Sequence, residues 1–173
     1  TWGTTEAATS TVQYGLTTSY GSQATSSGTT SHSVALSGLT ESTLYHFRIT
    51  SIDAIGNTST TTDRTFTTTD GTAPLITGIA TSTTHTTATI NWNTNEAATS
   101  TVQYGTTISY GSQATSSSTS THTVTLGGLS PSTTYHYQIT ARDASGNVTN
   151  TSDAIFVTSA APDTTAPTIT SVN

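Results

Sequence analysis

Short stretches of alternating apolar and polar residues recur along the chain and predict β-strands throughout. Between residues 85 and 93, Ala88, Ile90 and Trp92 fall on every second position, which is the period of a strand with one buried face. The same period predicts strands over 75–80, 85–93, 99–104, 121–126, 134–142 and 149–158, with a further short strand near 114–118. Turn-forming residues separate them at 93–96, 105, 127–128, 130–131 and 145–147. Seven short strands in roughly 90 residues predict an antiparallel β-sandwich.

The sequence repeats itself at an offset of 90 residues. Residues 6–15 match residues 96–105 without a change, and residues 19–27 match residues 109–117 in the same way. An Asp-x-Thr-Ala-Pro join occurs at 70–74 and again at 163–167. We therefore expect two sandwiches arranged end to end and part of a third. The expected divisions are a repeat at 1–70 that lacks its first strand, a complete repeat at 71–160, and a linker with the first strand of a further repeat at 161–173.

The tail of the chain repeats the opening strand of the complete repeat. Residues 167–172 correspond to residues 74–79, with Pro167 in the place of Pro74 and Ile169 in the place of Ile76. Two interpretations fit this pattern: the chain is a window on a longer array, or separate subunits lend the strand to one another. In both, strand 166–172 leaves the second repeat and binds a neighbouring repeat or an identical subunit.

The composition excludes several classes of partner. Charged residues make up 7% of the chain, against about 25% in ordinary globular domains. The net charge is −6, Lys is absent, and the basic residues are Arg48, Arg64 and Arg142. We therefore expect no nucleic-acid partner, because no basic surface can form. No apolar run approaches the length of a membrane span, so no membrane partner is expected either. The acidity and the excess of Thr and Ser indicate an extracellular or cell-surface location.

Several residues together carry a resemblance to the fibronectin type III family. Pro74 opens the first strand of the complete repeat, Trp92 ends the second on its inner face, and Tyr104 lies in the third. The run 129–135, Leu-Ser-Pro-Ser-Thr-Thr-Tyr, is similar to the family's tyrosine corner. Gly146 in the last hairpin also fits, whereas Glu41 replaces the corner Pro in the first repeat. The resemblance implies a spacer, adhesive or scaffolding module without chemistry of its own. Related modules are appended to carbohydrate-active enzymes and to phosphatases.

Strand phase and family position also predict the core. We expect buried side chains at Trp92, Tyr104, Leu129, Tyr135 and Phe156, and at the matching positions Trp2, Tyr14, Leu39, Tyr45 and Phe66.

No catalytic residues are predicted, and the chain is not expected to be an enzyme. Each repeat holds a His pair, His32 with His46 and His122 with His136. The members of a pair fall on strands of opposite sheets, so a shared metal ion is not expected. The sequence contains no Gly-x-Ser-x-Gly motif and no phosphate-binding loop.

Carboxylates near the join give the one candidate metal site. Asp70 in the linker and Glu96 and Asp143 in two loops fall where this fold brings loops to one pole. Oxygen ligands of this kind suit a weakly bound calcium ion, although Asp also stabilises turns without any metal. No other cofactor is expected.

Three acceptor triplets make Asn57, Asn147 and Asn150 candidate glycosylation sites.

Two functional hypotheses follow. The first is a non-catalytic structural repeat of an extracellular array, such as a stalk, adhesin shaft or filament. The alternative is a module that binds a carbohydrate or a protein, or an accessory module of a secreted multidomain enzyme. Sugar binding needs exposed aromatic rings, and only Tyr20 and Tyr110 are expected to supply them.

Overall fold

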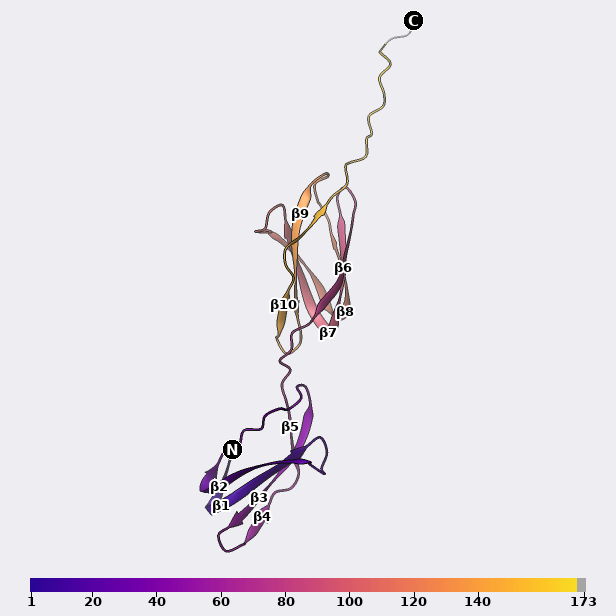
Figure 1. Ribbon diagram of the computed structural model, residues 1–173. Helices are drawn as coiled ribbons and strands as arrows, with labels where there is room; N and C mark the ends of the chain where they lie inside the picture. The colour runs from indigo at the N-terminus through magenta and orange to yellow at the C-terminus, as the bar shows by residue number, and fades with distance from the viewer. Residues whose placement is uncertain (171–173) are drawn as a thin grey trace. The chain divides into compact units, whose positions relative to one another are not determined.

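The computed structural model describes residues 1–170, and this part of the chain contains β-strands and no helix (Figure 1). The chain divides into two compact units, Thr1–Gly71 and Thr72–Asn173. The first unit contains β1 (Trp2–Gly15), β2 (Ser22–His32), β3 (Leu44–Asp53), β4 (Thr58–Thr60) and β5 (Arg64–Thr67). The second contains β6 (Ile76–Thr83), β7 (Ala88–Gly105), β8 (Ser112–Leu126), β9 (Thr134–Arg142), β10 (Val148–Asn150) and β11 (Ala154–Val157). The all-β prediction is confirmed.

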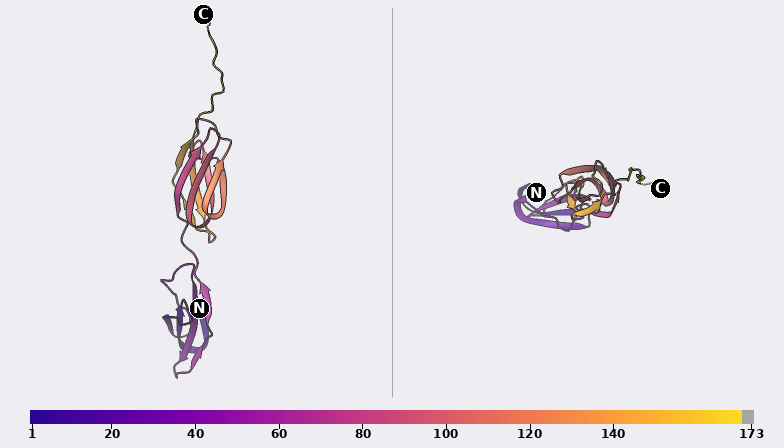
Figure 2. Two further views of the ribbon diagram at one scale, coloured as in Figure 1. Left: turned by 90° about the vertical axis from the view of Figure 1, so that its right-hand side faces the viewer. Right: turned by 90° about the horizontal axis from the view of Figure 1, so that it is seen from above.

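The second unit is an antiparallel sandwich whose two layers share long strands (Figure 2). The first part of β7 pairs with β6, and its last part, Thr99–Gly105, pairs with β9. Strand β8 follows β7 along most of its length, and β10 and β11 both pair with β9. Because β7 changes partners halfway along, it passes from one layer to the other.

The strand count in the second unit differs from the prediction, which was seven. The described residues of this unit form six strands, as a result of two mergers and one division. The expected turn at 93–96 does not interrupt β7, and 114–118 and 121–126 form one strand, β8. The pairing of β7 with β8 shifts register between Asn93 and Ala98. Such a bulge bends a strand without ending it. The predicted strand over 149–158 is instead divided between β10 and β11.

The core prediction is confirmed for Trp92, Leu129, Tyr135 and Phe156 in the second unit, all of which are buried. It is wrong for Tyr104, which is half-buried at the end of β7 and packs against the core from its margin.

In the first unit, Tyr45 is buried as predicted. The prediction is wrong for Trp2, Tyr14, Leu39 and Phe66, which are half-buried. The described part of the first unit has no strand in the position that β6 occupies in the second, so one side of its core is less covered.

Both units contain the tyrosine corner. The Ser130 N–H donates to the Tyr135 hydroxyl at 3.0 Å, and the Thr40 N–H donates to the Tyr45 hydroxyl at 3.1 Å. The replacement of Pro131 by Glu41 in the first repeat therefore leaves the corner hydrogen bond in place. The Glu41 carboxylate accepts a hydrogen bond from the Gly71 N–H at 3.0 Å.

We predict that Tyr135→Phe destabilises the second unit by about 1–3 kcal/mol, because it leaves the Ser130 N–H without its acceptor in a partly buried turn. Urea denaturation followed by circular dichroism measures the change. Tyr110→Phe is the control and should cost less, since the hydroxyl of Tyr110 bonds an exposed carboxylate. Equal losses of stability for the two variants would contradict a stabilising role for the corner hydrogen bond.

A buried histidine packs against the core Trp of the second unit. His122 is 1% exposed, and its ring stacks on Trp92 with centroids 5.0 Å apart. Its Nε2 lies 3.1 Å from the Thr94 hydroxyl, and its Nδ1 lies 3.0 Å from the Ser116 hydroxyl. Burial lowers the pKa of His122 below its ordinary value of 6.5, although a hydrogen bond with the backbone of Thr119 acts in the opposite direction.

We predict that acidification from about pH 7.5 to about pH 5 destabilises the second unit. The folded-state pKa of His122 is depressed, so the unfolded chain binds the proton more readily. His122 therefore contributes to the free energy of unfolding at pH values above its pKa in the unfolded chain, near 6.5. This contribution is lost as the pH falls below that value. Urea midpoints at the two pH values measure the effect. A His122→Phe variant should show a smaller pH dependence, and an unchanged dependence would contradict the assignment.

Candidate functional site

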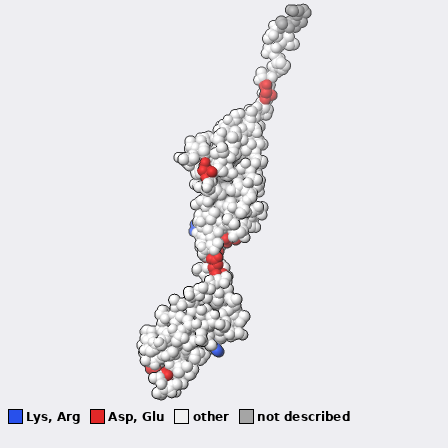
Figure 3. Space-filling model, in the orientation of Figure 1, with Lys and Arg blue, Asp and Glu red and all other residues white. Residues whose placement is uncertain are grey.

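Charged groups are sparse, and Figure 3 shows a face on which most side chains are uncharged.

Asp143 directly follows β9 and is buried. Its Oδ1 accepts hydrogen bonds from the N–H groups of Gly146 at 2.6 Å and Asn147 at 2.8 Å, and its Oδ2 accepts one from Asn147 Nδ2 at 2.8 Å. Burial acts to raise the pKa of Asp143, but the hydrogen bonds from Asn147, Gly146 and Ser145 outweigh it and lower the pKa. The carboxylate therefore holds the β9–β10 turn together.

The first unit repeats this turn. Asp53 Oδ1 accepts hydrogen bonds from the N–H groups of Ile55 at 2.9 Å and Asn57 at 2.8 Å, and its Oδ2 accepts one from Asn57 Nδ2 at 2.7 Å. The hydrogen bond from the Asn57 side chain is the main cause that lowers the pKa of Asp53. The recurrence of the turn gives this Asp a structural role in each unit.

Of the three candidate calcium ligands, two belong to the second unit. Glu96 is half-buried in β7, and one of its carboxylate oxygens lies within 4.8 Å of an Asp143 carboxylate oxygen. Asp70 is half-buried near the end of the first unit. A calcium ion held by Asp70, Glu96 and Asp143 would need one ligand from the first unit and two from the second. This site stays a prediction.

The candidate glycosylation sites differ in how their amides are used. Asn147 Nδ2 donates to Asp143 Oδ2 and, at 3.3 Å, to the Thr72 carbonyl, so a sugar on this nitrogen would disturb the turn. Asn57 Nδ2 donates to Asp53 in the equivalent turn. Asn150 is exposed on β10, and its amide oxygen accepts a hydrogen bond from the Thr140 hydroxyl at 2.6 Å. Glycosylation stays a prediction for all three.

A surface cluster that the sequence did not reveal joins Tyr110, His136 and Asp153. Asp153 Oδ2 lies 2.8 Å from His136 Nδ1, and Asp153 Oδ1 accepts a hydrogen bond from the Tyr110 hydroxyl at 3.1 Å. The hydrogen bond with His136 is the main cause that lowers the pKa of Asp153, although burial acts in the opposite direction. The cluster fastens the loop after β7 to β9 and to the segment before β11. The signal available in the sequence was the recurrence of all three residue types at an offset of 90.

The first unit holds the same cluster, formed by Tyr20, His46 and Asp63. The His46 Nδ1–Asp63 Oδ2 distance is 2.8 Å, the Tyr20 hydroxyl donates to Asp63 Oδ1 at 3.0 Å, and the Arg48 guanidinium lies 5.0 Å from the centroid of the Tyr20 ring. Tyr20 and Tyr110, expected as the exposed aromatic rings, are each half-buried.

The two histidines of each repeat have different surroundings. His122 is buried beside Trp92, whereas His136 is paired with Asp153 on the surface. The same division holds for His32, which stacks on Trp2, and His46, which pairs with Asp63.

Comparison with known proteins matches this chain to a domain family and to segments of two much longer enzymes. The purple acid phosphatase N-terminal domain model matches residues 76–159. Exoglucanase B of Cellulomonas fimi (strain ATCC 484) is 37% identical over 156 residues, which are 84% of this chain and 14% of that enzyme. Endoglucanase B of Cellulomonas fimi is 34% identical over 154 residues, which are 83% of this chain and 15% of that enzyme. The chain thus spans about a seventh of the length of these curated relatives.

Among solved structures, the FN1–FN3 domains of chicken CNTN1 resemble the chain with a TM-score of 0.46 and 13% identity, over 89% of this chain and 56% of that one. No helix in the described part of the chain has the length and hydropathy needed to cross a membrane. The sandwich topology and the two tyrosine corners support the fibronectin type III-like fold that the sequence predicts.

Proposed function

We propose that this chain is a non-catalytic accessory module of a secreted, multidomain glucan-degrading enzyme. One observation carries the proposal: an exoglucanase and an endoglucanase each align with more than four fifths of this chain but with only 14% and 15% of their own lengths. Sequence of this kind therefore makes up a small part of large enzymes. The accessory-module alternative consequently has more support than the stalk or filament hypothesis.

The arrangement of carboxylates in the second unit supports the non-catalytic part of the proposal. Most glycoside hydrolases use two carboxyl groups, one of which stays protonated because its pKa is raised. Glu96 and Asp143 are close enough to suggest such a pair. However, the pKa of Asp143 is lowered rather than raised, and its oxygens accept the hydrogen bonds that hold a turn. A carboxylate committed in this way is poorly suited to donate a proton.

An extracellular location is part of the same proposal. An insoluble or polymeric glucan cannot enter a cell, so an enzyme that degrades it acts outside. The low charged fraction, the absence of Lys and the absence of Cys suit a module whose stability rests on its packed core rather than on disulfides.

The proposal is tested on the 173-residue chain. Incubation with soluble β-glucan and with a phosphate monoester should release no reducing sugar and no phosphate above the buffer blank. Activity that co-purifies with the chain and is lost in a Glu96→Gln, Asp143→Asn double variant would overturn the non-catalytic assignment. The complete reading frame should also encode a catalytic domain.

The structural array is the second candidate, because residues 6–15 and 96–105 are identical. A complete reading frame with many further copies and no catalytic domain would favour that array over the accessory module.

A further inference from the structure

One sheet of the second unit has an outer face that solvent reaches, formed by β8, the last part of β7, β9 and β11. Gln103 on β7 lies opposite both Gln113 on β8 and Gln138 on β9. Two residues earlier on β9, His136 lies opposite Ile155 on β11, and Ile155 is 56% exposed. Directly opposite residues, and residues two apart on one strand, share a face of a sheet, so these side chains lie on the same surface.

The ring of Tyr110 borders this surface. Its hydroxyl donates to Asp153 Oδ1 at 3.1 Å, and Asp153 Oδ2 lies 2.8 Å from His136 Nδ1. The hydroxyl end of the ring is therefore held close to His136, whose cross-strand partner is Ile155. We call this surface the glutamine face, and its members are Gln103, Tyr110, Gln138 and Ile155.

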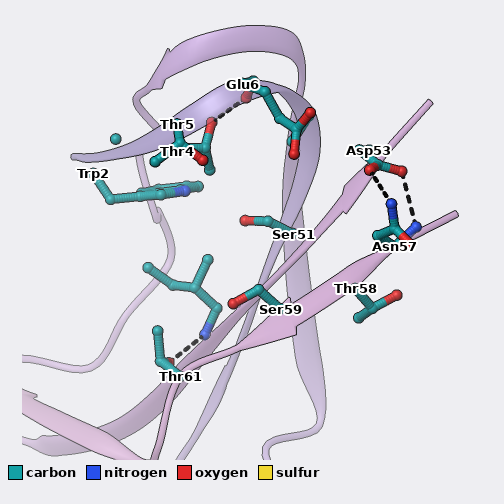
Figure 4. Close-up of a pocket in the computed structure, with 13 residues that line it drawn as sticks. Trp2, Thr4, Thr5, Glu6, Ser51, Asp53, Asn57, Thr58, Ser59 and Thr61 are labelled. Carbon is teal, nitrogen blue, oxygen red and sulfur yellow. Dashed lines mark hydrogen bonds between the residues drawn. The ribbon is translucent and has the colours of Figure 1, made fainter. Parts of the chain in front are cut away.

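In the first unit the equivalent face is closed by Arg48, which stands where Gln138 stands in the second. Its guanidinium lies 5.0 Å from the centroid of the Tyr20 ring, and its Nε donates to Gln13 Oε1 at 2.8 Å. Arg48 lies on the outer face of β3, because Ser51, an odd number of residues away, lines the inner cavity shown in Figure 4. One arginine thus packs on the tyrosine ring and occupies the glutamine amide.

The second unit leaves both groups available. Gln138 has no positive charge, and its Nε2 donates to the Thr151 carbonyl at 2.8 Å. Among the described residues, no cation lies over the Tyr110 ring, and the side-chain amide of Gln103 makes no hydrogen bond. An aromatic ring, an exposed aliphatic side chain and an available amide therefore lie together on the glutamine face.

These groups match the chemistry of a neutral sugar polymer. A glucose ring presents C–H groups on its two faces, which pack on aromatic and aliphatic side chains. Its hydroxyls both donate and accept hydrogen bonds, as the amide of Gln103 does. The carboxylate of Asp153, whose pKa is lowered, can also accept from a hydroxyl and would repel an anionic ligand. A stable protein interface buries about 800 Å² on each partner, far more than this small group of side chains offers.

We propose that the glutamine face of the second unit binds a glucan chain, with a glucose ring against Tyr110 and Ile155 and its hydroxyls bonded to Gln103. This inference rests on the proposed function and gives the accessory module a role in holding the substrate. The face is open rather than a deep pocket, so each contact is weak. Linkage to a catalytic domain makes weak binding useful, because it raises the local concentration of the polymer.

An NMR titration of the 173-residue chain with cellohexaose tests the proposal. We expect shifts in the side-chain amide of Gln103 and the backbone amide of Ile155, but none in the equivalent Gln13 and Thr65. Gln138→Arg should weaken binding at least tenfold, because Arg at this position of the first repeat packs on the Tyr ring. The first repeat also shows that the fold accommodates this residue.

The reciprocal change should create a second site. The double variant Arg48→Gln, Thr65→Ile gives the first unit the residues of the glutamine face, and the number of cellohexaose molecules bound per chain should rise from one to two. Arg64→Gln is the matched control, because it removes a positive charge from an exposed side chain of the first unit that has no counterpart on the glutamine face. It should leave the number at one.

Two results would overturn the proposal: no binding at millimolar cellohexaose, which would favour a protein as the occupant of the face, or binding that Gln138→Arg leaves unchanged. Neither result bears on the accessory assignment, which depends on a catalytic domain in the complete reading frame. Binding at the glutamine face together with a reading frame that lacks such a domain would support the site and refute the accessory assignment.

Discussion

Trp92→Ala is expected to destabilise the second unit by about 3–5 kcal/mol, the usual loss when a buried aromatic residue is truncated. Trp92 is 1% exposed and stacks on His122 with an interplanar angle of 5°. Removal of the indole leaves a cavity and also uncovers the His122 ring. Native-state hydrogen exchange of amides in β7 and β9 measures this loss within the second unit, because those strands hold its two layers together.

The matched control is Trp2→Ala in the first unit. Trp2 stacks on His32 in nearly the same geometry, at 5.1 Å and 8°, but its side chain is half-buried. Folding removes less apolar surface from water at Trp2 than at Trp92. The loss of stability measured from the amides of β1 and β3 should therefore be smaller. Equal losses for the two variants would mean that the first unit covers its Trp as fully as the second, contrary to the burial described above.

The strand period predicted the core well where both layers are present. Strand phase placed Trp92, Tyr135 and Phe156 on inner faces, family position added Leu129, and all four are buried. Alternation states which face a residue occupies but not how much of the opposite layer covers it. It therefore could not distinguish Trp92 from Trp2, whose local sequences are alike but whose neighbouring strands differ.

The strand boundaries were harder to predict than the strands. The polar stretch 93–96 has the composition of a turn, yet it lies inside β7. What keeps the strand continuous is pairing with residues far along the chain, Asn93 with Thr121 and Ala98 with Thr119. A bulge between these pairs absorbs the change of direction. Such long-range pairing leaves no local mark in the sequence.

The cluster of Tyr110, His136 and Asp153 escaped prediction for a related reason. Its members come from a loop, a strand and the segment before β11, and only the folded chain brings them together. By contrast, a turn role for Asp143 was the stated alternative to metal binding, because Asp commonly stabilises turns through the nearby backbone. Its hydrogen bonds from Asn147 are of this local kind.

Gly105→Ala is expected to destabilise the second unit by at least about 3 kcal/mol, at or beyond the upper end of the usual cost of overpacking. A Cβ at Gly105 would overlap the carbonyl group of Tyr110, which is backbone and cannot rotate away. Tyr110 already has a positive φ of 56°, and its N–H donates to the Thr107 carbonyl at 3.0 Å. The loop therefore cannot move aside without breaking this turn and the hydrogen bond from the Tyr110 hydroxyl to Asp153. Urea denaturation of the variant measures the loss.

Gly127→Ala is the control: a Cβ there meets nothing within 4 Å, and Gly127 has no positive φ. It should be neutral or stabilise the unit by about 0.4–1 kcal/mol, because Ala restricts the unfolded chain. Similar urea midpoints for Gly105→Ala and Gly127→Ala would show that the loop after β7 does not pack as closely as described.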